Sequence, residues 1–246
     1  MLVTDKKYYM EKKLIHKLDL MIARMKHGKD NVLLIDGDEG DGKSNLAAAC
    51  CYYFAYHTKR KLDLNNVFFD LDTLIDFAIK TKEQIIWWDE AALGGLAADW
   101  WRKNQKKFIK LLMVARKKKH FFVICIPKFF KLNEYLVIDR SIGLVHVYLR
   151  KGIKHGYFVY FNQKRKEHLW EDWKKSKWRN YKKHNNFRGT FGLVLRRVIN
   201  EEEYDKKKDI AILSIDKEDE TKDLRTFKKE LLKDIMVGLE NKGVKL

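Results

Sequence analysis

Eight residues after an apolar run have the types and spacing that bind phosphate. The run Asn31–Asp36 is followed by Gly37-Asp-Glu-Gly-Asp-Gly-Lys43-Ser44, which matches G-x-x-x-x-G-K-[ST] between a strand and a helix. Glycines let backbone N–H groups surround phosphates, Lys43 can reach the β- and γ-phosphates, and the Ser44 hydroxyl can ligate Mg²⁺. We therefore predict a nucleotide site. Its predicted residues are Gly37, Asp38, Glu39, Gly40, Asp41, Gly42, Lys43, Ser44 and Asn45.

Three residues of this loop are acidic, which is unusual where phosphates approach. Asp38, Glu39 and Asp41 would repel a phosphate if their carboxylates lay beside it. We therefore predict that all three side chains point outward to solvent.

A second apolar run, Gln84–Trp88, ends in the adjacent acids Asp89 and Glu90. In a Walker B motif the first acid holds the hydration shell of Mg²⁺, here together with Ser44, and the second polarises the attacking water as a general base. The alternative is a buried strand that ends in an acidic turn. The phosphate loop 46 residues upstream favours the catalytic interpretation.

The carboxylate directly after Asp89 makes the chain resemble the additional-strand, catalytic-glutamate class of P-loop ATPases. GTPases fit less well, because the guanine-reading pattern Asn-Lys-x-Asp is absent. The nearest match, Asn241-Lys-Gly-Val244, has the wrong fourth residue. The resemblance therefore implies ATP and Mg²⁺ as cofactors.

Alternating strand and helix patterns surround these motifs. An amphipathic helix over 14–25 precedes the first strand, and a strand at 67–70 precedes a helix over 71–81. After Gly94-Gly95 we expect a long helix and then a buried strand at 121–126. This alternation predicts an α/β fold with a mainly parallel sheet flanked by helices. The apolar face of the long helix comprises Phe108, Leu111, Leu112 and Ala115.

From Leu144 the pattern changes to a terminal strand pair. Residues 144–149 and 157–161 flank a basic hairpin loop, residues 193–199 favour a further strand, and residues 224–239 indicate an amphipathic helix. We divide the chain into a P-loop ATPase core with an N-terminal helix, residues 1–162, and a basic linker helix with a small C-terminal region, residues 163–246.

Composition agrees with a globular protein, since 46% of the residues are hydrophobic. The cysteines Cys50, Cys51 and Cys125 have the spacing of neither a disulfide framework nor a zinc site. The apolar runs are far shorter than the roughly 20 residues that a membrane span needs. We therefore predict no transmembrane segment and a cytoplasmic location.

Positive charge is concentrated in the middle of the chain. Net charge is −2 over residues 1–100, +22 over 101–200 and −2 over 201–246. Solvated lysines on helix surfaces are the ordinary explanation, but so large a difference between neighbouring segments favours a polyanion partner, above all nucleic acid. The predicted nucleic-acid contacts are Lys117, Lys118, Lys119, Lys164, Arg165, Lys174, Lys175 and Lys182.

Aromatic residues are interleaved with the cations between 164 and 183, where nine basic residues accompany four large rings. Exposed rings stack on bases, while rings at helical spacing more often pack on a core. Both interpretations stay open. The rings belong to Trp170, Trp173, Trp178 and Tyr181.

Over residues 25–162 the order of motifs resembles the FtsK/HerA branch of these ATPases, which includes DNA pumps of chromosome segregation, conjugation and viral genome packaging. The resemblance also uses Arg116 before the strand at 121–126 and Arg140 before the strand pair. It implies a homo-oligomeric ring in which a neighbouring subunit supplies a catalytic arginine. Arg116 is the first candidate, Arg140 the second and Arg102 the third; alternatively, Arg116 belongs to a cationic edge with the lysines that follow it.

One departure from the branch concerns its polar sensor. Many members have this residue near the end of the strand after Walker B, where this chain has Ile124-Cys-Ile-Pro127. The sensor is therefore not assigned.

The small size separates two kinds of DNA pump. Large terminases of tailed phages add a nuclease domain, whereas about 84 residues follow the strand pair here, too few for a complete nuclease. The chain thus resembles the small packaging ATPases of protein-primed phages, which implies a translocase of double-stranded DNA and a portal or other capsid protein as partner. The alternatives are a DNA-transfer or replication-loader ATPase activated by a protein, and a morphogenesis or signalling ATPase whose basic surface meets acidic protein or lipid.

Overall fold

The structure of the protein is a computed structural model that describes residues 2–3, 5, 7–89, 98–126, 128–211 and 213. The backbone of residues 2–3 and 98–105 is described without their side chains. The Gly94-Gly95 break and the helix expected at 224–239 lie outside these ranges.

Seven strands form one sheet in the order β4-β5-β6-β3-β7-β8-β9. The first five strands in this order run parallel, and the β7–β8 and β8–β9 pairs are antiparallel. The predicted α/β fold with a mainly parallel sheet is therefore confirmed, as is the terminal strand pair. The strands are β3 (Asn31–Asp36), β4 (Val67–Phe68), β5 (Ile85–Asp89), β6 (Phe121–Ile126), β7 (Gly143–Arg150), β8 (Lys154–Asn162) and β9 (Phe187–Thr190), while β1 (Leu2–Val3) and β2 (Tyr8–Tyr9) pair separately.

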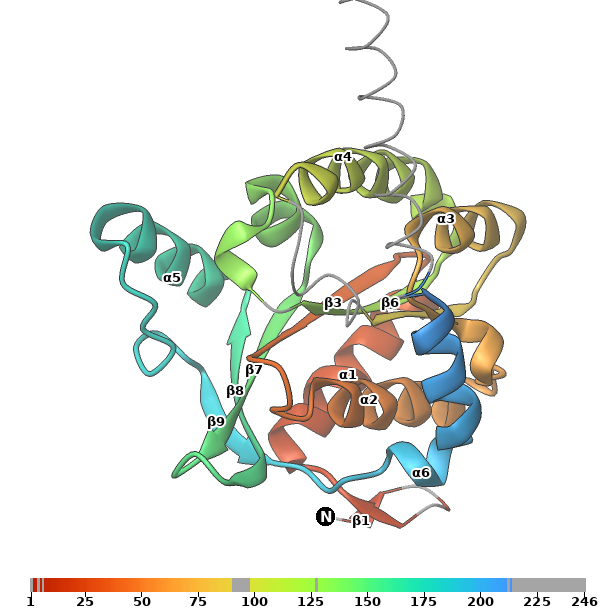
Figure 1. Ribbon diagram of the computed structural model, residues 1–246, viewed down its shortest axis with the longest axis horizontal. Helices are drawn as coiled ribbons and strands as arrows, with labels where there is room; N and C mark the ends of the chain where they lie inside the picture. Colours follow the sequence, from red (N-terminus) through yellow and green to blue (C-terminus); the bar gives the residue numbers. More distant parts are fainter. Residues whose placement is uncertain are drawn as a thin grey trace, which may run out of the picture.

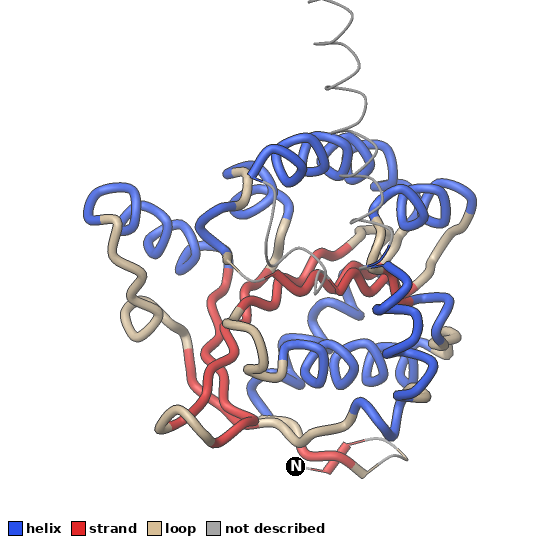
Figure 2. Tube along the Cα trace, viewed as in Figure 1, coloured by secondary structure: helices blue, strands red, loops and turns tan. Residues whose placement is uncertain are grey.

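Helices cover both faces of the sheet (Figures 1 and 2). α1 and α2 lie on one face with α6 and the helical residues 201–211, and α3 and α4 lie on the other. The helices are α1 (Lys12–Lys26), α2 (Lys43–Thr58), α3 (Leu71–Lys80), α4 (Ala98–Val114), α5 (Gln163–Ser176) and α6 (Leu195–Val198). The 3-10 helices are η1 (Leu64–Asn66), η3 (Ala115–Lys118) and η4 (Phe129–Lys131), and η5 (Tyr135–Arg140) is a π-helix.

The central strands alternate between two hydrophobic cores. In β5, Trp87 faces the core around α1 and α2, and its neighbour Trp88 faces the core beneath α3 and α4. Successive strand residues point to opposite faces, so a strand covered on both sides is apolar throughout. The predicted apolar face of α4 is buried as expected in the second core.

The segment after residue 162 returns to the same sheet. β9 pairs with β8, which places it at the sheet edge, and α6 packs on α2. The strand predicted at 193–199 is wrong: residues 195–198 are helical. Asn45 explains this turn, because its side-chain oxygen accepts the backbone N–H groups of Val194 (2.9 Å) and Leu195 (3.0 Å) where a strand partner would otherwise be needed.

Candidate functional site

The predicted phosphate loop joins β3 to α2, and two of its glycines are required by the backbone. Gly42 has φ 99° at the start of α2. Gly37 has φ 153°, and a Cβ there would lie 2.5 Å from the carbonyl oxygen of Val147. No side chain caps the N-terminus of α2. Its first N–H groups therefore present the positive end of the helix to an anion.

Lys43 extends back across this loop. Its ammonium donates to the carbonyl oxygens of Gly37 at 2.8 Å and of Asp38 at 2.7 Å. Among the described residues no carboxylate pairs with this ammonium, and the two backbone carbonyl oxygens hold it at the mouth of the loop. The cation thus lies where a phosphate would approach the helix N-terminus.

The three acids of the loop differ in placement. Asp38 and Glu39 are exposed as predicted, but the prediction for Asp41 is wrong, because its side chain is buried. Its Oδ2 accepts the backbone N–H of Asp38 at 3.0 Å and so braces the loop from within. Burial raises the pKa of the Asp41 carboxyl above its usual value.

The predicted metal ligands Ser44 and Asp89 are linked by a tyrosine that sequence analysis did not identify. The Tyr204 hydroxyl donates to Oδ2 of the buried Asp89 at 2.5 Å and also hydrogen-bonds the Ser44 side chain. Burial, reinforced by the Asp89 charge, raises the pKa of Tyr204, so the phenol remains the proton donor. Ser44 and Asp89 therefore both interact with the Tyr204 hydroxyl.

Tyr204 comes from the helical segment 201–211, which crosses the site after α6. Its ring packs against Trp87 and Phe69, with centroids 5.7 and 5.2 Å away. Lys207 then donates to the carbonyl oxygens of Leu64 (3.0 Å) and Val67 (2.7 Å). The chain after residue 190 thus closes one side of the predicted nucleotide site.

A second unpredicted cluster lies at the carboxyl end of β3. Asp36, directly before the phosphate loop, is buried, and its Oδ1 lies 3.0 Å from Nδ1 of His146. Its Oδ2 accepts the Tyr181 hydroxyl. The His146 and Tyr181 rings stack 3.5 Å apart with planes 2° from parallel. Asp36 is thereby held by two residues from distant parts of the chain.

These residues fit a magnesium nucleotide. The uncapped helix and Lys43 suit phosphates, and Ser44 with Asp89 supplies the oxygen ligands that Mg²⁺ prefers. The described residues contain no group of three or more His, Cys, Asp or Glu placed to hold a metal. A magnesium ion bound largely through phosphate and water needs no such group. Glu90, the predicted general base, lies outside the described residues.

Comparison with known proteins adds no family. No protein-family model matches the chain, and no curated protein matches its sequence. None of the described helices is long and apolar enough to cross a membrane. Any proposal about function therefore depends on the arrangement of the residues at the site.

Two of the predicted arginines lie far from the phosphate loop of their own chain. Arg116 and Arg140 line a cavity of about 420 Å³ beside Asp30, at the start of β3, whereas the phosphate loop follows its end. Six strand residues span about 20 Å. Arg140 already has partners within its own chain, because it pairs with buried Asp30 at 2.5 Å and donates to the Leu112 carbonyl at 2.9 Å. Arg102 lies in α4, and its side chain is outside the described part.

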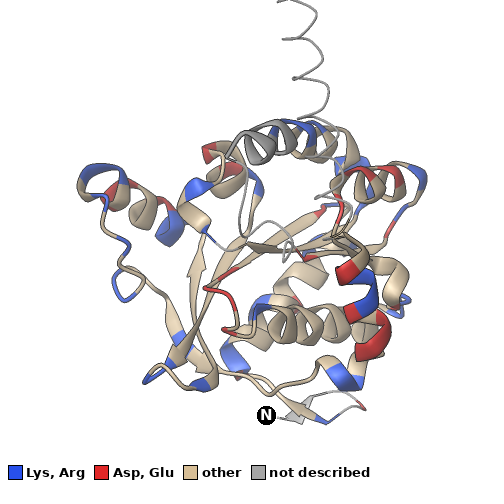
Figure 3. Ribbon diagram, viewed as in Figure 1, with Lys and Arg blue, Asp and Glu red and all other residues tan. Residues whose placement is uncertain are grey.

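The predicted nucleic-acid residues form two groups. The lysines at 117–119 follow α4 near α3, where Lys118 donates to the Ile79 carbonyl and Lys119 pairs with Glu83. The other five are exposed on α5 and the loop after it, at the opposite side of the view (Figures 1 and 3). One of these five, Lys174, pairs with Glu134 at 2.6 Å. The structure therefore does not join the two groups into one patch.

The four interleaved aromatics divide between the two interpretations. Trp170 is buried and Trp173 stacks on Phe130, as expected of rings packed on a core. α5 ends at Ser176, so Trp178 and Tyr181 do not continue its face. Tyr181 turns inward to Asp36, and Trp178 is 72% exposed.

Proposed function

We propose that the protein is an ATPase that uses ATP hydrolysis to move nucleic acid, as a viral genome-packaging or related DNA-transfer motor. The observation that carries this proposal is the phosphate loop between β3 and α2 with Asp89 beside Ser44. β6 lies between β3 and β5 in the sheet. This inserted strand supports the resemblance to the additional-strand class of ATPases.

Each residue of the site has a defined task in this proposal. The α2 N-terminus and Lys43 bind the phosphates, and Ser44 and Asp89 orient the metal shell. Bound ATP supplies the γ-phosphoryl group, and Mg²⁺ neutralises the charge of its oxygens. Glu90 accepts the proton of the attacking water. Buried Asp41 accepts a hydrogen bond from the backbone N–H of Asp38 and so stabilises the conformation in which the loop binds phosphate.

The nucleic-acid partner is supported by charge. The +22 segment includes α5, whose exposed cations Lys164, Arg165 and Lys175 are free to contact phosphates along one helix. A ring is supported by the position of Arg116: it is exposed at the far end of the sheet, so it reaches a phosphate loop only across a subunit boundary. A portal or other capsid protein would be the partner of such a packaging ring.

The deciding experiment is steady-state ATP hydrolysis with and without long double-stranded DNA at two salt concentrations. We expect strong stimulation by DNA that weakens at high salt, and no turnover by Lys43→Ala. The matched control is Lys59→Ala, an exposed lysine at the far end of the same helix. Turnover by Lys43→Ala equal to that of wild type would refute the nucleotide site.

A loader ATPase activated by a protein partner is the second candidate. The contact of Tyr204 with Asp89 favours it, because the segment after α6 then has to be rearranged before the metal site is complete. Hydrolysis indifferent to DNA but raised by a purified partner protein would support this candidate over the motor.

A further inference from the structure

The loop between α5 and β9 exposes one aromatic ring among cations. Trp178 is 72% exposed, whereas Trp170 on the preceding helix is buried. Lys177, Arg179 and Lys182 of the same loop are exposed. No Asp or Glu occurs between residues 173 and 200, so no carboxylate of this stretch neutralises them. A lone indole in a cationic setting suits a ligand that has both phosphates and flat rings.

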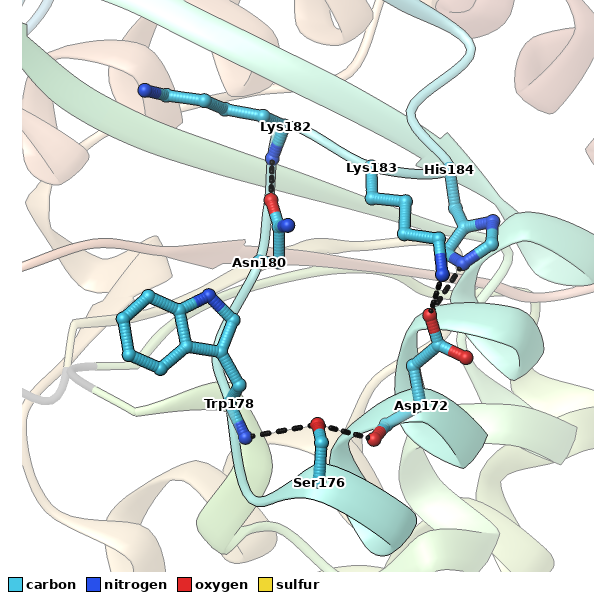
Figure 4. A network of polar contacts seen from close by, with 7 residues as sticks. All are labelled: Asp172, Ser176, Trp178, Asn180, Lys182, Lys183 and His184. Atoms are coloured by element: carbon cyan, nitrogen blue, oxygen red, sulfur yellow. Dashed lines mark hydrogen bonds and ion pairs between the residues drawn. The ribbon is translucent and has the colours of Figure 1, made fainter.

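The loop is held in shape by its own hydrogen bonds (Figure 4). The Ser176 hydroxyl donates to the backbone carbonyl oxygen of Asp172 at 2.8 Å and accepts a hydrogen bond from the backbone N–H of Trp178 at 3.1 Å. The Asp172 carboxylate accepts from Lys183 (2.6 Å) and His184 (2.8 Å), which lowers its pKa to about 2. Hydrogen bonds therefore hold the loop at its start, around Ser176, and at its end, around Lys183 and His184.

The hydrogen bonds of this loop engage Lys183 and leave the side chains of Trp178 and Lys182 exposed. Lys183 is committed to Asp172, while the indole of Trp178 and the side chain of Lys182 extend to the side of the view away from that carboxylate (Figure 4). The Asn180 side chain accepts the Lys182 N–H at 3.2 Å, which fixes the backbone from which this lysine projects. A cation and a ring face are therefore presented together.

The inner end of the same loop contacts the nucleotide site. Tyr181, three residues after Trp178, stacks on His146 and donates to Asp36. Asp36 directly precedes Gly37, the first residue of the phosphate loop. Tyr181 therefore gives this loop a direct contact with β3, the strand that leads into the phosphate loop.

We propose that residues 177–183 bind single-stranded nucleic acid, with Trp178 stacked on an unpaired base and Tyr181 linking the loop to the phosphate loop. Lys177, Arg179 and Lys182 contact the backbone phosphates. An unpaired base is the fitting ligand because bases in a duplex are stacked on one another, so only a single strand offers a free ring face. The assignment rests on the proposed nucleic-acid partner and names the form of nucleic acid that this loop takes.

The test compares two probes that carry the same phosphates. Fluorescence anisotropy would measure affinity for a labelled oligothymidylate and for an abasic oligonucleotide of equal length. Stacking contributes about 1–3 kcal/mol per base, so the wild type should prefer the first probe by roughly 5- to 150-fold. Trp178→Ala should abolish the preference, and Trp178→Phe should retain most of it.

A matched charge variant separates the two contributions. Lys182→Gln should weaken both probes equally and reduce the salt dependence of binding by about one phosphate contact. A base preference that survives in Trp178→Ala would overturn the inference while the proposed function stands. Binding of anionic vesicles that Trp178→Ala abolishes, with no base preference in the wild type, would also overturn it. Failure to bind any nucleic acid at low salt would refute the proposed partner itself.

The link to the nucleotide site has a readout of its own. Oligothymidylate affinity would be measured with and without a saturating non-hydrolysable ATP analogue. We expect the analogue to change the affinity of the wild type several-fold and Tyr181→Phe to bring the ratio toward one. Retention of the full ratio by Tyr181→Phe would remove the coupling role of Tyr181.

Discussion

The contact between Tyr204 and Asp89 makes a quantitative prediction about magnesium. Tyr204→Phe removes one oxygen and keeps the ring between Phe69 and Trp87. Asp89 is 2% exposed, so water does not readily replace the lost donor. A hydrogen bond to a charged group contributes about 1.5–3 kcal/mol. The metal-free protein should lose about this much unfolding free energy.

The same loss should appear as a gain in metal affinity. If Mg²⁺ displaces the Tyr204 hydroxyl from Asp89 and Ser44, the variant weakens only the metal-free state. Because about 1.4 kcal/mol corresponds to a factor of ten, the apparent affinity for Mg²⁺ with nucleotide should rise roughly 10- to 150-fold. Fluorescent-nucleotide binding during a Mg²⁺ titration measures this shift, and urea unfolding in EDTA measures the stability.

Tyr53→Phe is the matched control, because the Tyr53 hydroxyl donates to another carboxylate, Asp19, at 2.7 Å and away from the site. It should lower stability without changing the Mg²⁺ titration. Destabilisation of Tyr204→Phe together with Mg²⁺ binding equal to or weaker than that of the wild type would contradict displacement of the hydroxyl by Mg²⁺. The hydroxyl would then remain on Asp89 in the metal-bound state.

The other predictions concern catalysis, the buried ion pair and pH. Glu90→Gln should keep ATP bound but stop hydrolysis, as measured by nucleotide binding and turnover; normal turnover would exclude Glu90 as the general base. Arg116→Ala doped into wild-type protein should depress activity more than dilution does, and a merely proportional loss would exclude an arginine acting between subunits. Arg140→Ala should lower the unfolding free energy by about 3–5 kcal/mol in urea titrations, because Asp30 is left buried and unpaired; a loss below about 1 kcal/mol would contradict this. Burial lowers the pKa of Lys166 to about 7, so between pH 7 and the usual lysine pKa the unfolded chain binds a proton that the native state does not. Stability should therefore rise with pH there by up to roughly 1.4 kcal/mol per unit, a slope that Lys166→Met should remove in urea titrations at several pH values.

Local patterns were sufficient for much of the fold and for naming half of the candidate site. The continuous burial of the apolar strands β3, β5 and β6 and the buried face of α4 follow from neighbouring residues, and the structure agrees with both. The phosphate loop is likewise local, since its glycine spacing, Lys43 and the start of α2 lie within eight residues. The strand predicted at 193–199 failed because apolar runs of this length do not distinguish a short helix from a strand.

Contacts between distant segments needed the tertiary structure. Tyr204 and Asp89 are 115 residues apart in the sequence, and Tyr181 and Asp36 are 145 apart. Tyr204 stands in no motif, and Tyr181 stood out in the sequence only as one of four rings interleaved with cations. The burial of Asp41 also depended on the folded loop, in which its carboxylate turns inward to the Asp38 N–H.

The sequence by itself determined which groups this protein has available: a loop that matches the phosphate-binding pattern, two acids after a buried strand, and a segment of concentrated positive charge. Hydrogen-bonding geometry and side-chain periodicity operate over a few residues, so a local pattern encodes them directly. The tertiary structure alone decided which groups meet. In the folded chain Tyr204 contacts the predicted metal ligands Ser44 and Asp89. Arg116 and Arg140 lie at the end of β3 opposite the phosphate loop, and Trp178 is exposed. These outcomes depend on strand order and on packing between elements, which no short stretch of the chain specifies.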